Sequence, residues 1–584
     1  MEFVRGASAL QFGPQIGGYI NYVLKDGFDV TFLFSTSQTI GSDGLFNSFN
    51  SIGGTKNKWK YYGFLQYRRM DGWRQNSDQT QLSGFASVKY SATDKLQIGA
   101  EYTLLRNEIH MPGGLTDELF KLDPDTSVRA RNWLESPWNI ISGNLKYTIN
   151  KNTSFSFITS YLFSQRNLIW RNEDGWPDEM DTITPDLTYV PRELEREYFK
   201  STTNEFRFLT NYKLGNNSST LSSGVRIAYS NLKRLEGAEG TTGSDFDLTQ
   251  LSDWEVDMNF HTINIAPFIE NIFRIGNQFT VTPGLRFEYL ESSANGYSEN
   301  EAHDSPDEYV YANDQKSSRK FLLPGLGLQY KISEAVNMYA NYSKSFRPIT
   351  YSDLTPFGTI AKIDPNLKDN YGDNFDLGIR GYLHDIVNFD ISGFYLKYYD
   401  RIGQVEKTND TANYLFRTNT GTSEHYGLES YIEINISNLL NSNIDKRTWG
   451  SLSVYNSLAY VNAKYTEGEF KGNYVEYAPK VIDRVGVRYA YKHFSANAQY
   501  SFTAKQYGDA TNTVYSPDAL VGILPSYQVI DFSASYKVKN YQFRFGVNNL
   551  ANERYFTLRT SEYPGPGIIP SPGRTFYAGI GANF

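Results

Sequence analysis

Carboxylate side chains gather in two stretches of the sequence and are the first groups whose spacing could serve chemistry. Several carboxylates in one loop can bind Ca²⁺ through their oxygen atoms. Neither stretch has the ligand spacing of an EF-hand loop, so solvated carboxylates are the favoured interpretation. The two sets are Asp245, Asp247, Asp253, Glu255 and Asp257, and then Asp364, Asp369, Asp373 and Asp376.

Motifs for catalysis or for a resident metal are missing from the sequence. It has no Cys, which excludes disulfides, thiolate zinc sites and Cys nucleophiles. The six His are scattered, and no pair has the spacing of an HExxH motif. There is no serine nucleophile elbow and no glycine loop that cradles phosphate. The sequence therefore predicts no enzyme, no metal site and no cofactor.

The elements that must position any binding residue are strands with two different faces. Residues 530–537, 541–548 and 575–584 each alternate apolar and polar or small side chains with period two. A soluble sandwich buries such an apolar face in its core. A transmembrane barrel turns the apolar face to lipid and keeps the polar face toward a wet lumen. In the last stretch the apolar face is made of Phe576, Ala578, Ile580, Ala582 and Phe584.

The connections between the alternating stretches favour the membrane barrel. Short turns tend to alternate with long polar stretches, and a membrane meander has short turns on one side and long loops on the other. A propeller would repeat a blade signature along the chain, and no internal repeat is present. The short connections are 91–95, 150–152, 274–277, 331–334 and 538–540, and the long ones are 106–136, 166–201, 233–260, 292–319, 346–373, 504–525 and 552–573.

Length and composition agree with this interpretation. The 584 residues suffice for a barrel of about 20 or more strands. Aromatic residues reach 16%, which girdles at two membrane interfaces would explain, although propellers and sandwiches also favour aromatics. No run of about 18 apolar residues exists, so a transmembrane helix is excluded. The net charge of −8 offers no basic footprint for nucleic acid.

Motifs at both ends of the chain resemble those of TonB-dependent outer-membrane receptors. Residues 4–23, VRGASALQFGPQIGGYINYV, look like the closing motif of the plug domain in that family. Residues 548–556, NNLANERYF, and the terminal Phe584 look like its last two strands. Residues 281–288, VTPGLRFE, and 425–429, HYGLE, are also similar. The resemblance covers essentially the whole chain, and the two end motifs together are highly specific.

The resemblance implies an all-β fold, a large transmembrane antiparallel β-barrel of about 22 strands with a plugged lumen. Residues 1–26 are then the C-terminal remnant of the plug domain, and residues 27–584 are the barrel. The first residues show no signal-peptide pattern, and neither a TonB box nor most of a plug is present. We therefore expect the sequence to be part of a longer protein.

Three further segments are similar to ferric dicitrate receptors within that family: residues 111–115, MPGGL, 459–463, AYVNA, and 512–514, NTV. This implies import of a ferric chelate like ferric citrate across the outer membrane of a Gram-negative bacterium. Implied partners are the TonB–ExbB–ExbD complex, outer-membrane lipid and lipopolysaccharide, with no nucleic acid and a monomeric receptor.

The resemblance also implies ligand-binding residues. Ferric citrate carries several carboxylates, which planar guanidinium groups bind bidentately. Arg166 and Arg192 are similar in placement to ligand arginines of the citrate receptors, in or at the rim of one long loop, and Lys407 falls near a polar ligand position. A third ligand arginine has no counterpart in the acidic stretch 245–257, and a contact near Tyr563 is not retained. These departures leave the citrate assignment weaker than that of the family.

Two other functions stay open at this point. A barrel without its plug would be a passive pore, which conductance in planar bilayers would reveal. A receptor of the same family could instead import another cargo, such as an oligosaccharide, although carbohydrate receptors are usually much longer. Preferential binding of iron-loaded over iron-free citrate would favour the ferric-chelate receptor.

Overall fold

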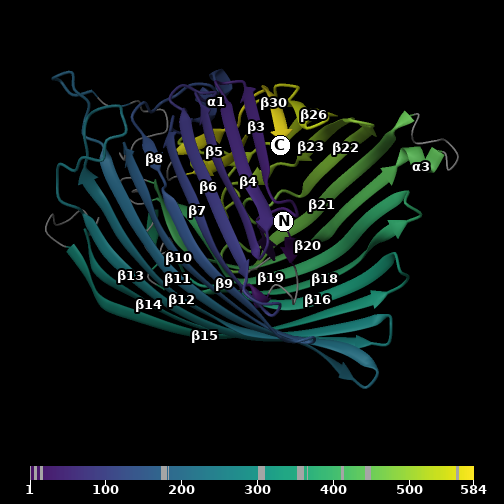
Figure 1. The fold of residues 1–584 in the computed structure, drawn as a ribbon. Coiled ribbons are helices and arrows are strands. Elements are labelled where there is room, and N and C mark those ends of the chain that lie inside the picture. Colours follow the sequence, from purple (N-terminus) through teal and green to yellow (C-terminus); the bar gives the residue numbers. More distant parts are fainter. Residues whose placement is uncertain are drawn as a thin grey trace.

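The computed structural model is a closed antiparallel β-barrel, with 22 long strands in the part of the chain that it describes (Figure 1). This confirms the predicted all-β barrel. The description covers residues 2–4, 10–13, 18–171, 181, 183–299, 309–350, 361–364, 366–408, 413–440, 449–560 and 564–584.

The long strands follow one another around the barrel in chain order. They are β3 (Leu33–Gly41), β4 (Phe46–Lys56), β5 (Trp59–Met70), β6 (Gln79–Ser91), β7 (Leu96–His110), β9 (Trp138–Asn150), β10 (Thr153–Trp170), β11 (Glu193–Leu214), β12 (Asn217–Glu239), β13 (Val256–Ile275), β14 (Phe279–Glu299), β15 (Tyr309–Lys331), β16 (Val336–Arg347), β18 (Asn370–Leu383), β19 (Val387–Thr408), β20 (Asn413–Asn435), β21 (Ser451–Glu467), β22 (Val481–Tyr491), β23 (Phe494–Thr503), β26 (Tyr527–Val538), β27 (Tyr541–Asn548) and β30 (Thr575–Asn583).

Several short strands and helices lie at the barrel wall or in the connections between its strands. The strands β8 and β17 attach to the barrel sheet, and three two-stranded sheets lie apart from it. Within the described residues, no helix is long and apolar enough to cross a membrane. The short elements are β1 (Glu2–Val4) with β2 (Tyr19–Asn21), β8 (Trp133–Glu135), β17 (Ala361–Ile363), β24 (Gln506–Tyr507) with β25 (Ile523–Leu524), β28 (Phe556–Thr560) with β29 (Gly567–Pro570), and the helices α1 (Asp117–Leu122) and α3 (Ile436–Leu440).

The barrel closes between its first and last strands. β3, in purple, lies beside β30, in yellow (Figure 1), in a register that runs from Ser35 opposite Asn583 to Gly41 opposite Tyr577. Phe34 and Phe584 exchange two backbone hydrogen bonds of 3.0 and 2.8 Å at the end of this seam. Every long strand in the described residues then has two neighbours, and β15 pairs with β16 only over its last seven residues, Gly325–Lys331.

The N-terminal segment identifies the inner face. Gln11 Nε2 donates to Glu270 Oε1 of β13 at 2.8 Å, and Arg286 Nη1 of β14 donates to the carbonyl oxygen of Leu10 at 3.1 Å. The opposite, outward face carries the exposed apolar side chains, among them Phe576 and Ile580 of β30. The apolar face of the C-terminal strand therefore points outward, as predicted for a membrane barrel. Residues 5–9 and 14–17 of the plug-like motif lie outside the described residues.

The two ends of the barrel differ as the connections predicted. All five predicted short turns join neighbouring strands, for example β9 to β10 and β26 to β27. The predicted loops 166–201 and 233–260 are wrong at their ends, because β10 continues to Trp170, β11 begins at Glu193, β12 continues to Glu239 and β13 begins at Val256. These polar residues extend the wall because charged side chains on its inner face pair with one another, as described next.

Candidate ligand-binding mouth

Arg166 lies in strand β10 and not in a loop, which corrects the sequence prediction. The register places it opposite Glu197 of β11, and Glu197 opposite Arg234 of β12. These residues share the inner face with Arg207, whose Nη1 donates to Gln11 inside the barrel at 3.4 Å.

The guanidinium of Arg166 is part of a buried ion network. Its Nη2 lies 2.7 Å from Glu195 Oε2, and its Nε lies 3.0 Å from Glu197 Oε2. Arg234 Nη2 lies 2.7 Å from the other oxygen of Glu197 and Arg234 Nε lies 3.3 Å from Glu236 Oε1. Three carboxyl groups thus face two guanidinium groups, and burial raises the pKa of Glu236 to about 8.

Arg192 directly precedes β11 and is almost fully buried, with 1% of its surface exposed. Its Nη1 donates to the carbonyl oxygens of Arg131 at 2.9 Å and Asp245 at 2.8 Å. Its Nε and Nη2 donate to the carbonyl and hydroxyl oxygens of Thr241 at 3.1 and 2.7 Å. Burial, assisted by the charge of Arg131, lowers the pKa of Arg192 to about 10. The side chain therefore stays charged at neutral pH and joins three chain segments.

Lys407 is the one exposed cation of the three predicted ligands. It lies near the end of β19, with its Nζ 4.0 Å from the centre of the Phe416 ring. Arg166 and Arg192 lie on or beside the neighbouring strands β10 and β11, whereas Lys407 lies on another part of the wall. Arg192 lies five residues before Glu197, the residue opposite Arg166, so the two arginines lie on adjacent strands at different heights along the wall.

The acidic residues considered for Ca²⁺ bind protein groups. Among the described residues, no three His, Asp or Glu side chains are grouped to hold a metal ion. Asp369 pairs with Arg319 at 2.8 Å, and Asp257 pairs with Lys233 at 3.2 Å. Asp373 accepts a hydrogen bond from the Tyr342 hydroxyl at 2.9 Å. These three carboxylates thus have protein partners, whereas Asp245 and Asp253 are exposed.

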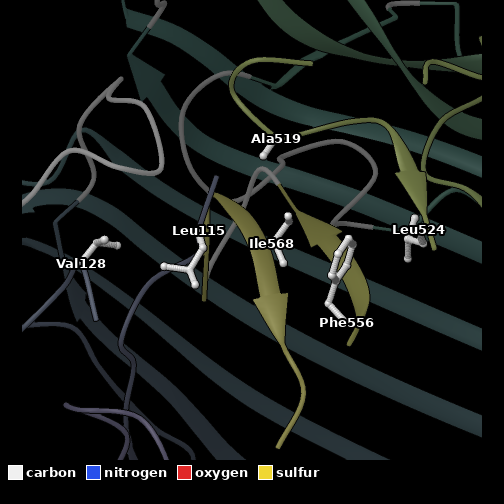
Figure 2. Packing of buried hydrophobic residues seen from close by; sticks show 6 residues of the cluster. All are labelled: Leu115, Val128, Ala519, Leu524, Phe556 and Ile568. Atoms are coloured by element: carbon white, nitrogen blue, oxygen red, sulfur yellow. The ribbon is translucent and has the colours of Figure 1, made fainter. Parts of the chain in front are cut away.

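Three long connections pack together at the loop end of the barrel. An apolar cluster joins the connection after β7 to the connections after β23 and β27 (Figure 2). Leu115 and Ile568 lie on facing segments and exchange backbone hydrogen bonds of 2.9 and 2.8 Å. The cluster consists of Leu115, Val128, Ala519, Leu524, Phe556 and Ile568, and we call it the loop cluster.

Arg559 ties the same three connections and was missed by the sequence reasoning. Its Nη1 and Nη2 donate to the two carboxylate oxygens of Asp117 at 2.8 and 2.7 Å. They also donate to the carbonyl oxygens of Ala519 and Ile523, both at 3.1 Å. No local signal marks Arg559, because Asp117 lies 442 residues away in the chain.

This packing explains the two glycines of the MPGGL stretch, Gly113 and Gly114. A Cβ on Gly114 would lie 2.0 Å from the carbonyl oxygen of Pro566, and Gly113 has a φ of +79°. Two backbones therefore approach too closely for any side chain at residue 114. The sequence resemblance singled out these residues, and the structure shows their local role.

A comparison with known protein families shows to which family the chain belongs. The sequence pattern described as "TonB dependent receptor-like, beta-barrel" matches residues 26–550. The chain belongs to the TonB-dependent receptor family. Members of the family bind ferric chelates and interact with TonB, and the family and its relatives are receptors and transporters, not enzymes.

Individual receptors are similar to this member of the family. The probable TonB-dependent siderophore receptor PiuA of Acinetobacter baumannii is 22% identical over 357 residues, which are 56% of this chain and 44% of PiuA. The chain thus aligns with less than half of that relative's length.

Solved structures extend the likeness in fold. The unliganded ferric citrate transporter FecA has a TM-score of 0.81 at 22% identity, with 100% of this chain and 83% of FecA covered. The PiuA structure scores 0.77 at 16% identity, with 100% of this chain and 86% of PiuA covered. The copper transporter OprC scores 0.74 at 14% identity, with 98% and 84% covered. At these identities the likeness concerns the fold.

Proposed function

We propose that this receptor imports a ferric chelate through the outer membrane of a Gram-negative bacterium, with energy supplied through TonB. The observation that carries the proposal is the family membership of the barrel. Relatives named for ferric citrate and for siderophores support the cargo class. As part of the proposal, residues 1–26 belong to a plug domain, which the contacts of Leu10 and Gln11 with the inner wall support.

The cargo that we propose is an anionic chelate like ferric citrate, with Arg166, Arg192 and Lys407 as its cationic ligands. Lys407 is exposed and can meet a carboxylate without rearrangement. Arg166 and Arg192 already donate to protein oxygens, so each must exchange partners to hold the chelate. Lys407 is therefore the group expected to make first contact.

The test measures binding of ferric citrate and of iron-free citrate to the purified full-length receptor. We expect the iron-loaded form to bind preferentially and Lys407→Gln to weaken it about threefold to fivefold, the effect of one exposed charge. The double variant Arg166→Ala with Arg192→Ala should abolish binding. Arg554→Ala, which removes another exposed cation of the loop end, is the matched control.

Unchanged ferric citrate binding by the double variant would remove Arg166 and Arg192 from the site. Equal binding of neutral sugars would contradict the ferric-chelate class. The copper transporter OprC shares the fold, so another metal cargo is the specific alternative, and competition by copper would favour it. Conductance of the full-length receptor in planar bilayers, unblocked by ferric chelates, would favour a passive pore.

A further inference from the structure

Four polar side chains form a patch on one face of the neighbouring strands β3 and β4, next to the seam where the barrel closes. Gln38 lies opposite Ser48, and Thr36 lies opposite Asn50. Side chains of directly opposite residues share one face of a sheet, and so do residues two positions apart in a strand. We call these four residues the seam patch.

The seam patch points away from the lumen. Gln38 also lies opposite Ile580 of β30, which is on the outward face. Ser37, between Thr36 and Gln38 in the chain, points the other way and binds Arg544 on the inner face. The four polar side chains therefore face the surroundings of the barrel.

Apolar side chains enclose the seam patch on all sides. Toward the loop end, Ile40 and Phe46 are an opposite pair, 62% and 42% exposed. Toward the short turns, Phe34 lies opposite Ile52. On β5, Leu65 and Tyr67 lie opposite Asn50 and Ser48, and on β30, Ile580 and Ala582 lie opposite Gln38 and Thr36. The seam patch is thus a polar island in an apolar surface.

The seam patch lies at the depth of the hydrocarbon core. Strand β3 has nine residues and β4 has eleven, which matches the ~9–11 residues of a tilted membrane-crossing strand. Gln38 and Asn50 each lie next to the middle residue of their strand. No water is available to polar groups at that depth.

Hydrogen bonds within the seam patch use only part of its capacity. Thr36 Oγ1 donates to Asn50 Oδ1 at 2.7 Å, and Gln38 Nε2 donates to Thr36 Oγ1 at 2.9 Å. Asn50 Nδ2 donates to Ser48 Oγ at 3.0 Å. Within the part of the chain that the structure describes, Gln38 Oε1 accepts no hydrogen bond and the Ser48 hydroxyl donates none. Leaving such groups unpaired in hydrocarbon costs free energy, so a polar partner stabilises the patch.

A second copy of the receptor supplies the matching groups. The open groups of the seam patch include an acceptor, Gln38 Oε1, and donors, the Ser48 hydroxyl and the second N–H of the Asn50 amide. A two-fold axis through the patch sets the donors of one copy against the acceptors of the other. Acyl chains offer neither group. The apolar residues around the patch pack equally well against lipid, so the polar groups decide the association.

We propose that the receptor forms a two-fold symmetric dimer in the outer membrane through the seam patch. Gln38 and Asn50 of the two copies lie at the axis and hydrogen-bond across it. The dimer departs from the monomer that the family resemblance implies. The inference rests on the proposed outer-membrane location and is independent of the imported cargo.

The experiment measures association of the full-length receptor in lipid vesicles, by energy transfer between labelled copies over a range of receptor densities. We expect a dimer, which Gln38→Leu with Asn50→Leu weakens roughly tenfold because the hydrogen bonds across the axis are lost. The matched control is Thr159→Val with Asn204→Leu, which removes another outward hydrogen-bonded pair, on β10 and β11, and should associate like the unaltered receptor.

A disulfide cross-link tests the contact directly. The chain has no Cys, so Gln38→Cys introduces a single thiol at the seam patch, near the axis. We expect oxidation in the vesicles to give a covalent dimer, whereas Asn204→Cys gives none. This measurement keeps the test decisive if the Leu variant misfolds.

The outcomes separate the dimer from the other proposals. A receptor that inserts but stays monomeric at every density overturns the dimer, and so does a dimer that the Leu variant retains in full. Cross-linking of Gln38→Cys to a different protein in native outer membranes overturns the choice of a second copy as partner. Failure to insert into vesicles would instead contradict the outer-membrane location. Ferric citrate binding should be unchanged in the Leu variant, so a failure of the cargo proposal is detected separately.

Discussion

Arg559 is a single side chain on which the order of three connections depends. It is 4% exposed and binds both oxygens of Asp117, so its removal leaves a partly buried carboxylate without its partner. We predict that Arg559→Ala weakens local stability by about 3 kcal/mol, which accelerates hydrogen exchange roughly 100-fold. The measurement is amide exchange in residues 114–123 and 519–524.

Arg554 offers the matched control for this prediction. It also binds a carboxylate through two nitrogens, to Asp125 at 2.6 and 3.2 Å, but both side chains are more than 40% exposed. Exposed pairs contribute about 0–1 kcal/mol, so Arg554→Ala should leave the exchange rates of those segments nearly unchanged. Equal acceleration by both variants would contradict the role given to the burial of Arg559.

Arg192 gives a prediction about pH. Its folded-state pKa is lowered to about 10 from a usual value of 12.5, so its charge is lost only as the pH rises through about 10. Below that pH the Arg192 side chain holds its proton in both the folded and the unfolded chain, so it adds no pH dependence to the free energy of unfolding. The difference in thermal midpoint between the unaltered receptor and Arg192→Met should therefore be the same at pH 6 and pH 9. A difference that changes over this range would mean that Arg192 titrates near neutrality.

At the scale of an element, strand β27 separates a lipid-facing side from a lumen-facing side. Phe543 and Phe545 are exposed on the outer face, whereas Gln542 and Arg544 point the other way, and Arg544 Nη2 binds Ser37 Oγ of β3. We predict that Phe545→Arg destabilises the barrel by about 2–4 kcal/mol, the cost of a cation near the bilayer midplane. Gln542→Arg, on the wet face, should be nearly neutral. The two variants are compared by denaturant unfolding in lipid vesicles, and equal destabilisation would contradict the assignment of the faces.

Strands β10, β11 and β12 are longer than predicted, and they show why the ends of strands were harder to predict than which side chains face lipid and which face the lumen. Polar, charged sequence is usually a sign of a loop, and residues 166–201 were predicted as one. The register instead aligns Arg166, Glu197 and Arg234 so that each charge finds an opposite charge across a strand pair. Cross-strand pairs of opposite charge stabilise a sheet where like charges would not.

At the scale of the whole molecule, the loop cluster joins connections from the two ends of the chain. Leu115 and Ile568 are a hydrogen-bonded antiparallel pair, whose Cα atoms are about 5.5 Å apart, a separation that a disulfide can span. The chain has no Cys, so Leu115→Cys with Ile568→Cys gives one defined cross-link. The cluster is buried, and the Arg559–Asp117 ion pair ties the same connections. Because such a unit opens far less than mobile loops do, we predict that oxidation leaves the import rate within about twofold of the reduced form.

The reduced form of the same protein and the two single Cys variants are the controls for the cross-link. Loss of import on oxidation, restored by a reductant, would show that the mouth opens at the loop cluster. In that case the rigid unit formed by Leu115, Arg559 and Ile568 would have to be the moving part.

The sequence by itself determined the class of fold, the two faces of the strands, the short turns and the family. Each of these is local, because period-two alternation and turn residues are written in consecutive positions. It also pointed to Arg166, Arg192 and Lys407 through a resemblance of placement.

Only the tertiary structure decided what those residues touch. Arg192 is held by oxygens of Arg131, Thr241 and Asp245, and Arg559 is held by Asp117, 442 residues away. Such partners meet because strand register and barrel closure bring distant segments together, and neither is encoded in any short stretch.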